Sequence, residues 1–234
     1  MLIMIDGIDG SGKSTIVAVL KEYLTGEGNA IFDLRDYWLA NGKYPEFHEL
    51  KSYDFIFTSE PTYIGIGKVL REELINSNNH YPEKAIAHAF SLDRIVLYNK
   101  IIIPALKEKK CVISDRGVST SLCYQTLSGK LSIKEIAEMV GNSLALEYAP
   151  EHLIIMKVNP KEALARLKKR SEKQDNAVFE KLAFQTKAAD LFYSKEYKKL
   201  FEAHGTKVHY LPGNDKIDIM KTSAIKLFKQ ILTK

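Results

Sequence analysis

A glycine-rich segment near the start of the chain has the composition needed to hold a phosphate group. It reads Gly7-Ile-Asp-Gly-Ser-Gly-Lys-Ser and matches the phosphate-binding loop pattern G-x-x-x-x-G-K-[ST], with a strand-like run before it and a helical pattern after it. Glycines let backbone N–H groups converge on a phosphate, Lys13 can reach the β- and γ-phosphates, and Ser14 can coordinate Mg²⁺. The expected ligand is therefore a nucleoside triphosphate such as ATP, bound by Gly7, Ile8, Asp9, Gly10, Ser11, Gly12, Lys13, Ser14 and Thr15.

Charged residues also follow two later apolar runs. Asp115 and Arg116 come directly after Cys-Val-Ile-Ser, so Asp115 could hold Mg²⁺ through water and Arg116 could serve a crowded phosphate site. Glu60 follows the run that ends at Thr58, and Arg71 lies one turn into the helix expected after it. The alternative interpretations are a surface salt bridge between Asp115 and Arg116 and a helix-capping turn at Glu60.

Two pairs of side chains lie four residues apart and so share a face of an expected helix. Phe90 and Arg94 combine an aromatic ring with a guanidinium fork, which can stack on a base and bind its edge. Arg166 and Arg170 precede a polar stretch that is typical of a loop, and cations on a closing lid would neutralise charge on a transferred phosphoryl group. Phe90 could also be plain core, and the second pair could lie on a solvated face.

Positioning these groups requires elements that bring distant segments together. Five short, nearly continuous apolar runs are typical of strands buried on both faces of a parallel sheet, and longer helical patterns alternate with them. This alternation predicts a doubly wound α/β fold in three layers, a five-stranded parallel sheet between helices, with the ligand at the carboxyl ends of the strands. The expected strands are Leu2–Asp6, Phe55–Thr58, Cys111–Asp115, His152–Val158 and Lys207–Leu211.

Helical patterns fill the intervals, and Pro104 is expected to kink or end the longest one. The segment 30–54, which holds Trp38 and several other aromatic residues, breaks the rhythm, and we expect an irregular excursion or a short helical insertion there. The expected helices are Lys13–Leu24, Ile66–Asn76, Pro82–Lys109, Val118–Leu127, Ile133–Tyr148, Pro160–Arg170, Ala177–Ala203 and Lys216–Thr233.

The composition is that of an ordinary globular protein. The 234 residues are 45% apolar and 27% charged, carry a formal charge of +5, and contain no internal repeat, so we expect one domain over residues 1–234. No apolar run approaches the roughly 18 residues of a membrane span, and the start of the chain is too short for a signal-peptide core. Cys111 and Cys123 are expected to be buried thiols of a cytoplasmic protein, and the interleaved charges do not favour nucleic-acid binding.

Four motifs, taken together and in this order, resemble those of the thymidylate kinase family of P-loop nucleoside monophosphate kinases. They are the segment from Gly7 to Thr15, Thr58-Ser-Glu-Pro-Thr, Phe90-Ser-Leu-Asp-Arg and Asp115-Arg-Gly-Val-Ser-Thr-Ser-Leu-Cys-Tyr-Gln. The resemblance covers most of the chain outside residues 30–54. It implies a P-loop NTPase fold with a mobile lid at about residues 166–178, phosphorylation of dTMP by Mg-ATP, and a homodimer.

The resemblance also implies roles for individual residues. Asp9 would lie near the deoxyribose and the incoming phosphate, Phe90 would stack on thymine, and Arg94 would bind its edge. Arg71 and Arg116 would hold the acceptor phosphate, Tyr124 would crowd the 2′ position of the sugar, and Ser121 and Gln125 would lie near the base. The expected catalytic residues are Lys13, Arg116, Arg166, Arg170 and Asp9, the expected metal ligands are Ser14 and Asp115, and Glu60 joins the substrate site.

The chain departs from the family pattern in three places. Ser59 stands where bacterial members commonly have an arginine, Asn176 stands where the lid often carries one, and the 30–54 excursion lengthens the chain. The phosphate-binding loop contains no arginine, and in this the chain resembles the variety of the family in which lid residues, here Arg166 and Arg170 with Lys173, supply the cation for the transition state.

Other activities share parts of this pattern. A deoxynucleoside kinase would use Glu60 as a base toward a neutral hydroxyl, whereas the arginines at positions 71, 94 and 116 favour an anionic acceptor. A nucleoside monophosphate kinase with another base specificity is a second alternative. A GTPase switch would need Asn-Lys-x-Asp, and the segment from Asn99 to Ile102 lacks the aspartate.

Overall fold

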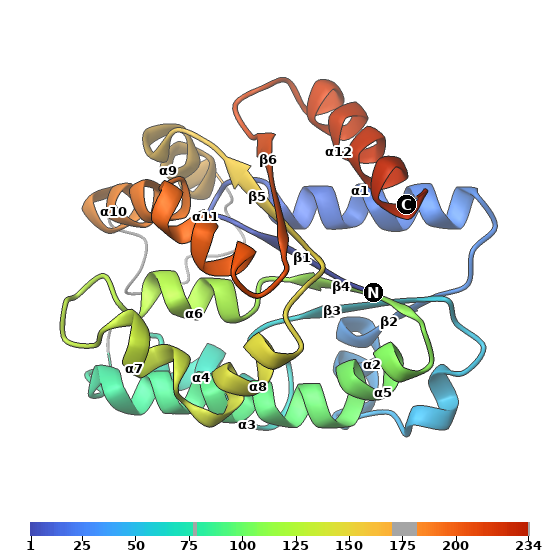
Figure 1. Cartoon of the computed structure of the whole chain (residues 1–234), viewed down its shortest axis with the longest axis horizontal. Coiled ribbons are helices and arrows are strands. Elements are labelled where there is room, and N and C mark those ends of the chain that lie inside the picture. The colour runs from blue at the N-terminus through green and yellow to red at the C-terminus, as the bar shows by residue number, and fades with distance from the viewer. Residues whose placement is uncertain (77–78, 170–181, 234) are drawn as a thin grey trace.

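The computed structural model describes residues 1–76, 79–169 and 182–233. Within these ranges, six parallel strands form one sheet in the order β2-β3-β4-β1-β5-β6 (Figure 1). The expected α/β class with helices on both faces is confirmed, but the expected count of five strands is wrong. The strands are β1 Leu2–Asp6, β2 Ile31–Asp33, β3 Phe55–Ser59, β4 Cys111–Asp115, β5 His152–Lys157 and β6 Lys207–Pro212.

The additional strand β2 lies inside the 30–54 excursion. It contains three residues, Ile-Phe-Asp, all half-buried, at the edge of the sheet beside β3. A run this short and this incompletely buried carries neither the length nor the apolar continuity that marks the other strands. Helix α2 (Leu34–Asn41) follows at once, so the short helical insertion expected there is present together with the unexpected strand.

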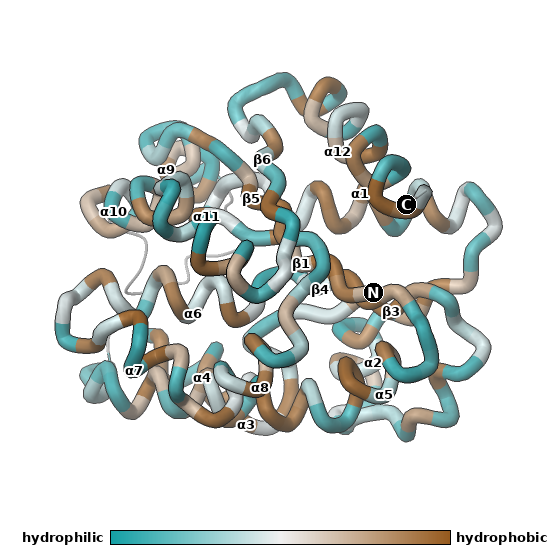
Figure 2. The backbone as a smooth tube through the Cα atoms, in the orientation of Figure 1, coloured by the Kyte–Doolittle hydropathy of each residue, from teal (hydrophilic) through white to brown (hydrophobic). Residues whose placement is uncertain are grey.

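An apolar cluster lies on each face of the sheet, as the residues of strand β1 illustrate. All five of its residues are buried, and they alternate between faces because successive side chains point to opposite sides of a strand. Leu2 and Met4 belong to the apolar cluster under α4, α6 and α8, whereas Ile3 and Ile5 belong to the cluster under α1 and α12. Apolar residues accordingly follow the strands and the inner faces of the helices in Figure 2.

The helices differ from their expected bounds mainly by being divided. The long helix expected over Pro82–Lys109 has a wider π-type turn at Tyr98–Ile102, which ends two residues before Pro104, a residue with no N–H to donate. Ser194 caps α11 by accepting from the N–H of Tyr197 at 3.1 Å, which separates α11 from α10. A 3-10 turn at Phe47–Leu50 and a second π-type turn at Leu70–Leu74, which contains Arg71, are also present. Besides α2, the α-helices are α1 Lys13–Gly26, α3 Gly65–Val69, α4 Glu83–Leu97, α5 Ile103–Lys107, α6 Val118–Tyr124, α7 Ile133–Ala137, α8 Val140–Glu147, α9 Pro160–Lys169, α10 Leu182–Phe192, α11 Lys195–Glu202 and α12 Ile217–Leu232.

Helices α4 and α8 approach each other closely at Gly141. A Cβ at this position would lie 1.8 Å from the carbonyl oxygen of Ser91, and the Gly141 N–H donates to Ser91 Oγ at 2.9 Å. Only glycine allows this backbone contact. The contact fixes the position of the residue that follows it, Asn142, which is completely buried.

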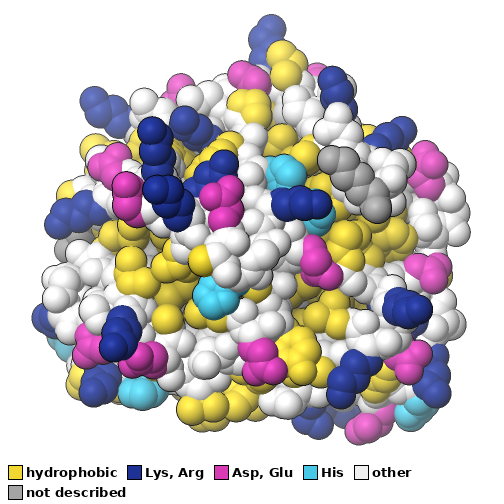
Figure 3. All heavy atoms as spheres, viewed as in Figure 1, with side chains coloured by type: hydrophobic (Ala, Val, Ile, Leu, Met, Phe, Trp, Pro, Cys, Tyr) yellow, Lys and Arg dark blue, Asp and Glu magenta, His cyan; other side chains and the backbone are white. Residues whose placement is uncertain are grey.

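The distribution of surface charge and the state of the cysteines agree with the sequence-based expectations. Lys and Arg side chains are interspersed with Asp and Glu on the face shown in Figure 3. Cys111 and Cys123 are free and buried, as expected. None of the described helices combines the length and apolar composition that a bilayer crossing requires.

Replacing Gly141 with alanine is predicted to destabilise the protein by at least about 2 kcal/mol, because the added methyl group overlaps the Ser91 carbonyl. Urea unfolding measures the change. The matched control is Gly26→Ala at the last residue of α1, where a Cβ meets nothing within 4 Å, so that this variant should be neutral or up to about 1 kcal/mol more stable. Equal stability of the two variants would contradict the packing described here.

Candidate active site

The carboxyl ends of three neighbouring strands converge at one edge of the sheet. Asp115 at the end of β4 pairs in register with Ile5 of β1 on one side and with Ser59 of β3 on the other. The Glu60 N–H donates to the Asp115 carbonyl at 3.0 Å, which ties the segment after β3 to β4. The three sequence motifs are therefore adjacent in space, as the parallel-sheet prediction requires.

The phosphate-binding loop connects β1 to α1. Its backbone adopts positive φ at several glycines, and at Gly10 (φ 77°) a Cβ would lie 2.2 Å from the Ala163 carbonyl of α9. Helix α9, which carries Arg166, therefore packs directly on the loop. The Lys13 ammonium donates to the carbonyl oxygens of Gly7 at 3.0 Å and Ile8 at 2.8 Å, so it lies inside the loop.

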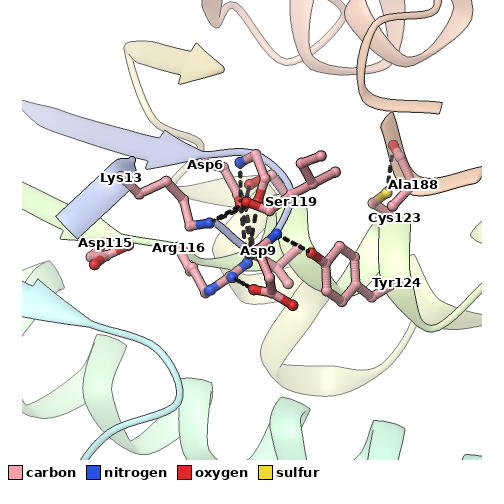
Figure 4. Close-up of polar contacts among 12 residues, drawn as sticks. Asp6, Asp9, Lys13, Asp115, Arg116, Ser119, Cys123, Tyr124 and Ala188 are labelled. Atoms are coloured by element: carbon pink, nitrogen blue, oxygen red, sulfur yellow. Dashed lines mark hydrogen bonds and ion pairs between the residues drawn. The ribbon is translucent and has the colours of Figure 1, made fainter. Parts of the chain in front are cut away.

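An ion-paired cluster holds this loop in place (Figure 4). The Arg116 guanidinium pairs with Asp9 and lies 3.6 Å from Asp6 Oδ1. Asp6 is completely buried and also accepts from the Gly7 N–H at 2.8 Å and from Thr120 Oγ1 at 2.7 Å. Removing one of these charges would leave the opposite charge buried and uncompensated, so the cluster is a strong constraint on the loop.

Arg116 has an unusual backbone conformation for a residue with a side chain. Its φ is 71°, in the left-handed region, which costs about 1–2 kcal/mol. The Arg116 N–H donates to the Ile5 carbonyl at 2.9 Å, and Ser114 Oγ donates to the Arg116 carbonyl at 2.6 Å. These bonds hold the strained residue and aim its side chain at the loop.

The charges in this cluster shift one another's ionisation. Burial acts to raise the pKa of Asp9, but Arg116 and Lys13 more than offset this and hold the pKa below its usual value. Burial acts against the charge of Arg116, yet Asp9 and the other acidic groups raise its pKa. Burial and the neighbouring Arg116 lower the pKa of Lys13 to about 8. The site therefore holds Arg116 firmly charged and Lys13 close to its titration point.

Ser14 and Asp115 are adjacent, as the two expected metal ligands should be. Ser14 Oγ lies 3.3 Å from Asp115 Oδ2, within hydrogen-bond distance. Asp115 Oδ1 is buried without a hydrogen-bond partner. A carboxylate oxygen and a hydroxyl beside the phosphate-binding loop are the kind of oxygen donors that Mg²⁺ takes alongside phosphate oxygens.

Arg94 is buried in a polar network that links three elements. Its Nη2 donates to Glu60 Oε2 at 2.7 Å and to Ser121 Oγ at 3.1 Å, and its Nη1 donates to Asn142 Oδ1. Burial raises the pKa of Glu60 to about 7, against the opposing effect of Arg94. Arg94 Nε is buried without a partner, which leaves one donor available to a ligand.

The other predicted residues lie around this centre. Arg71 donates from Nε to the carbonyls of Pro61 and Thr62 at 3.1 Å, and Phe90 is half-buried on α4, one turn before Arg94. Tyr124 Oη accepts from the Asp9 N–H at 3.1 Å. The expected lid is only partly visible: Arg166 lies on α9, 4.0 Å from Glu162, whereas residues 170–181, including Arg170, Lys173 and Asn176, lie outside the described residues.

Two predicted residues have polar side-chain atoms without a partner, and three further residues of the site were not predicted. Gln125 Oε1 is buried without a hydrogen-bond partner, and so is Ser11 Oγ in the loop. The sequence did not single out Asp6, Asn142 or Gln185, although Gln185 of α10 binds both the Asp9 N–H at 3.0 Å and the Asp9 carboxylate at 3.1 Å. Asp6 directly precedes the loop motif and could have been noticed. Asn142 and Gln185 lie in ordinary helical patterns that carry no such signal.

Comparison with known proteins places the chain among nucleotide kinases. A family model described as thymidylate kinase matches residues 46–224, a range that starts inside the excursion and so leaves out the phosphate-binding loop. The thymidylate kinase of Kosmotoga olearia is 27% identical over 235 residues, which cover 100% of this chain and 98% of that relative, loop included. Probable thymidylate kinases of Pyrococcus horikoshii (33% over 172 residues, 72% of this chain and 70% of theirs) and Thermococcus onnurineus (32% over 190 residues, 78% and 77%) are also similar.

The lowered pKa of Lys13 predicts how triphosphate binding depends on pH. Because the phosphates require the ammonium form, the affinity for Mg-ATP should fall above about pH 8, approaching tenfold per pH unit. Calorimetric titration between pH 7 and 9.5 measures this. In Lys13→Arg the guanidinium does not titrate in this range, so its affinity, whatever its absolute value, should lack the fall. An affinity of the unaltered protein that stays constant to pH 9.5 would show that Lys13 does not control binding.

Proposed function

The chain belongs to the thymidylate kinase family, and we propose that it transfers the γ-phosphoryl group of ATP to dTMP, giving dTDP and ADP. One observation carries the choice of acceptor: Arg71 and Arg116 lie at the same sheet edge, where burial and also the charge of Arg116 lower the pKa of Arg71. Two half-buried guanidinium groups beside the phosphate-binding loop suit an acceptor that is itself an anion.

The same geometry argues against a nucleoside as the acceptor. A nucleoside kinase needs a carboxylate that takes a proton from a neutral hydroxyl. Glu60 is 4% exposed and pairs with the buried Arg94, so it supports the arginine. The second pKa of a phosphate ester is about 6, so a nucleoside monophosphate presents an oxygen that is already ionised at neutral pH. No general base is required.

The base site is proposed to consist of Phe90, Arg94, Ser121 and Gln125. Phe90 would stack on thymine, and the unpaired Arg94 Nε would donate to a base carbonyl. Gln125 Oε1, which is also unpaired, would accept from the N–H of the same ring. A donor and an acceptor of this kind complement a pyrimidine that carries a carbonyl beside an N–H, which favours dTMP over a cytosine nucleotide.

The catalytic roles follow from charge. Lys13 would bind the β- and γ-phosphates, Arg116 would lie between donor and acceptor, and Arg166 and Arg170 of the lid would neutralise the transferred group. Asp9 would orient Arg116 through their ion pair. Tyr124 would lie against the sugar, next to Asp9, and exclude a 2′-hydroxyl.

Ser14 and Asp115 are proposed to hold Mg²⁺. The unpaired Asp115 Oδ1 and the adjacent Ser14 hydroxyl fit an ion that is bound mainly through phosphate and water oxygens. When bound, Mg²⁺ neutralises charge on the β- and γ-phosphates. Lys13 and Arg116 position those phosphates from the protein side.

A single domain, a homodimer and a cytoplasmic location complete the proposal. The single sheet and its flanking helices support one domain over residues 1–234. Leu92 and Val140 are 53% and 70% exposed and line one surface hollow beside α4 and α8, which suits a contact between copies. Buried free thiols at Cys111 and Cys123 fit a reducing compartment that also contains ATP.

A substrate panel tests the activity. With Mg-ATP and a set of nucleosides and nucleoside monophosphates, dTMP should be the preferred acceptor, and Lys13→Ala should abolish its turnover. Product analysis by chromatography distinguishes dTDP from dTMP. Phosphorylation of thymidine without phosphorylation of dTMP would refute the proposal.

Asn142 is predicted to affect the KM for the acceptor and not the KM for ATP. Its Nδ2 donates to the Ile136 carbonyl at 2.6 Å, so only its oxygen can face Arg94 and hold the guanidinium. Asn142→Ala should raise the KM for dTMP about tenfold and leave the KM for ATP unchanged. The neighbouring exposed Ser143→Ala is the control and should change neither constant. Equal increases in both constants for Asn142→Ala would mean that the residue supports the fold only.

A further inference from the structure

The 30–54 insertion places an arginine beside the acceptor arginine Arg71. The Arg35 guanidinium carbon lies 4.9 Å from the centre of the Tyr63 ring, and the Arg71 guanidinium carbon lies 3.9 Å from the centre of the same ring. Tyr63 belongs to the loop after β3 that also contains Glu60. The insertion therefore contacts the acceptor loop at the residue on which Arg71 rests.

Arg35 is held in this position by its own helix. It is the second residue of α2, and its N–H donates to the N-cap residue Asp33 at 2.9 Å. Asp33 also pairs with Lys21 of α1, and it is in register with Phe57 of β3. Because β2 is parallel to β3, the start of α2 lies at the same edge of the sheet as the phosphate-binding loop.

A second contact fixes the insertion on the acceptor loop. Trp38 of α2 is 1% exposed and packs edge-to-face on Tyr44, with ring centres 5.8 Å apart. The Tyr44 hydroxyl hydrogen-bonds Thr62, and burial raises the Tyr44 pKa, as do the charges of Asp93 and Glu60. The insertion is thus attached to both Thr62 and Tyr63, so Arg35 is placed by a folded element.

The charge of Arg35 has no carboxylate within ion-pair distance in the described part of the chain. Burial lowers the pKa of Lys21, and the charge of Arg35 acts in the same direction against the opposing charge of Asp36. The neighbouring strand β3 ends in the neutral Ser59, so Arg35 adds a positive charge beside that strand end.

We propose that Arg35 is an additional binding residue for the acceptor, which contacts the phosphate of the nucleoside monophosphate together with Arg71. This rests on the proposed function, since it assumes a monophosphate acceptor. Two arginines on one ring repel each other unless an anion lies between or beside them, and a phosphate dianion supplies that charge. The insertion then adds affinity for the phosphate and leaves recognition of the base to Phe90 and Arg94.

Comparison of a nucleotide with its nucleoside tests this role. Arg35→Ala should weaken dTMP binding at least about tenfold, because a hydrogen bond to a charged group is lost. It should leave the affinity for thymidine, which has no phosphate, unchanged, and it should also leave the KM for ATP unchanged. Arg35→Lys, which keeps the charge, should recover part of the loss. Calorimetric titration at constant ionic strength measures both ligands.

Lys43→Ala is the matched control, since it removes one exposed positive charge from the same insertion at a residue outside the Tyr63 contact. It should leave dTMP affinity unchanged. An equal loss of dTMP affinity in the two variants would mean that Arg35 acts only through its general positive charge. An equal loss of affinity for dTMP and thymidine in Arg35→Ala would mean that Arg35 only supports the loop. Either result overturns the proposal.

The test uses whichever monophosphate the unaltered enzyme phosphorylates fastest, paired with its nucleoside. If that is not dTMP, the proposed base specificity fails and the role of Arg35 is still measured. If no monophosphate binds, both proposals fail.

Discussion

Positive charge that is buried before any phosphate binds is the constraint on which this site depends. Lys13 is 6% exposed, and Arg116 lies beside it under the same loop. Charges of this kind are tolerated in a protein interior only when opposite charges and hydrogen bonds compensate them. Asp6 and Asp9 provide the compensation, and Thr120 and Gln185 in turn fix those carboxylates. The phosphate-binding loop is thus shaped in advance for a polyanion, as electrostatic stabilisation of phosphoryl transfer requires.

The rest of the fold positions other side chains of the site around that cluster. Parallel pairing brings the ends of β1, β3 and β4 to one edge, while α9 packs on Gly10 and places Arg166 on the helix that touches the loop. On the acceptor side, the contact between Gly141 and Ser91 sets the distance between α4 and α8, and hence the position of Asn142 against Arg94. The packing of α4 against α8 therefore determines the orientation of Arg94.

The 30–54 insertion contacts the loop after β3 that we propose to hold the acceptor. It adds an edge strand and a helix, and its contacts with Tyr63 and Thr62 reach the loop that carries Glu60. An insertion at the sheet edge can supply a charged side chain without disturbing β1 or the phosphate-binding loop, because only the edge strand β3 has to accept a new neighbour.

The sequence by itself determined the elements whose signal is local. The glycine–lysine–serine spacing, the buried strand runs and the strand-end charges predicted the α/β class, the loop and the meeting of Asp115 with Ser14. Each prediction rests on a local signal; Asp115 and Ser14 are 101 residues apart, but each lies at the end of a strand or loop that the local pattern identifies. Only the tertiary structure decided the rest: the sixth strand is too short to show a pattern, and Gln185 and Asn142 act through contacts 176 and 48 residues apart. The contacts of Arg35 and Arg71 with the ring of Tyr63 likewise depend on the parallel strands β2 and β3 ending at the same edge. Long-range contacts of this kind depend on how helices pack on the sheet, which is a property of the folded chain and not of any local spacing.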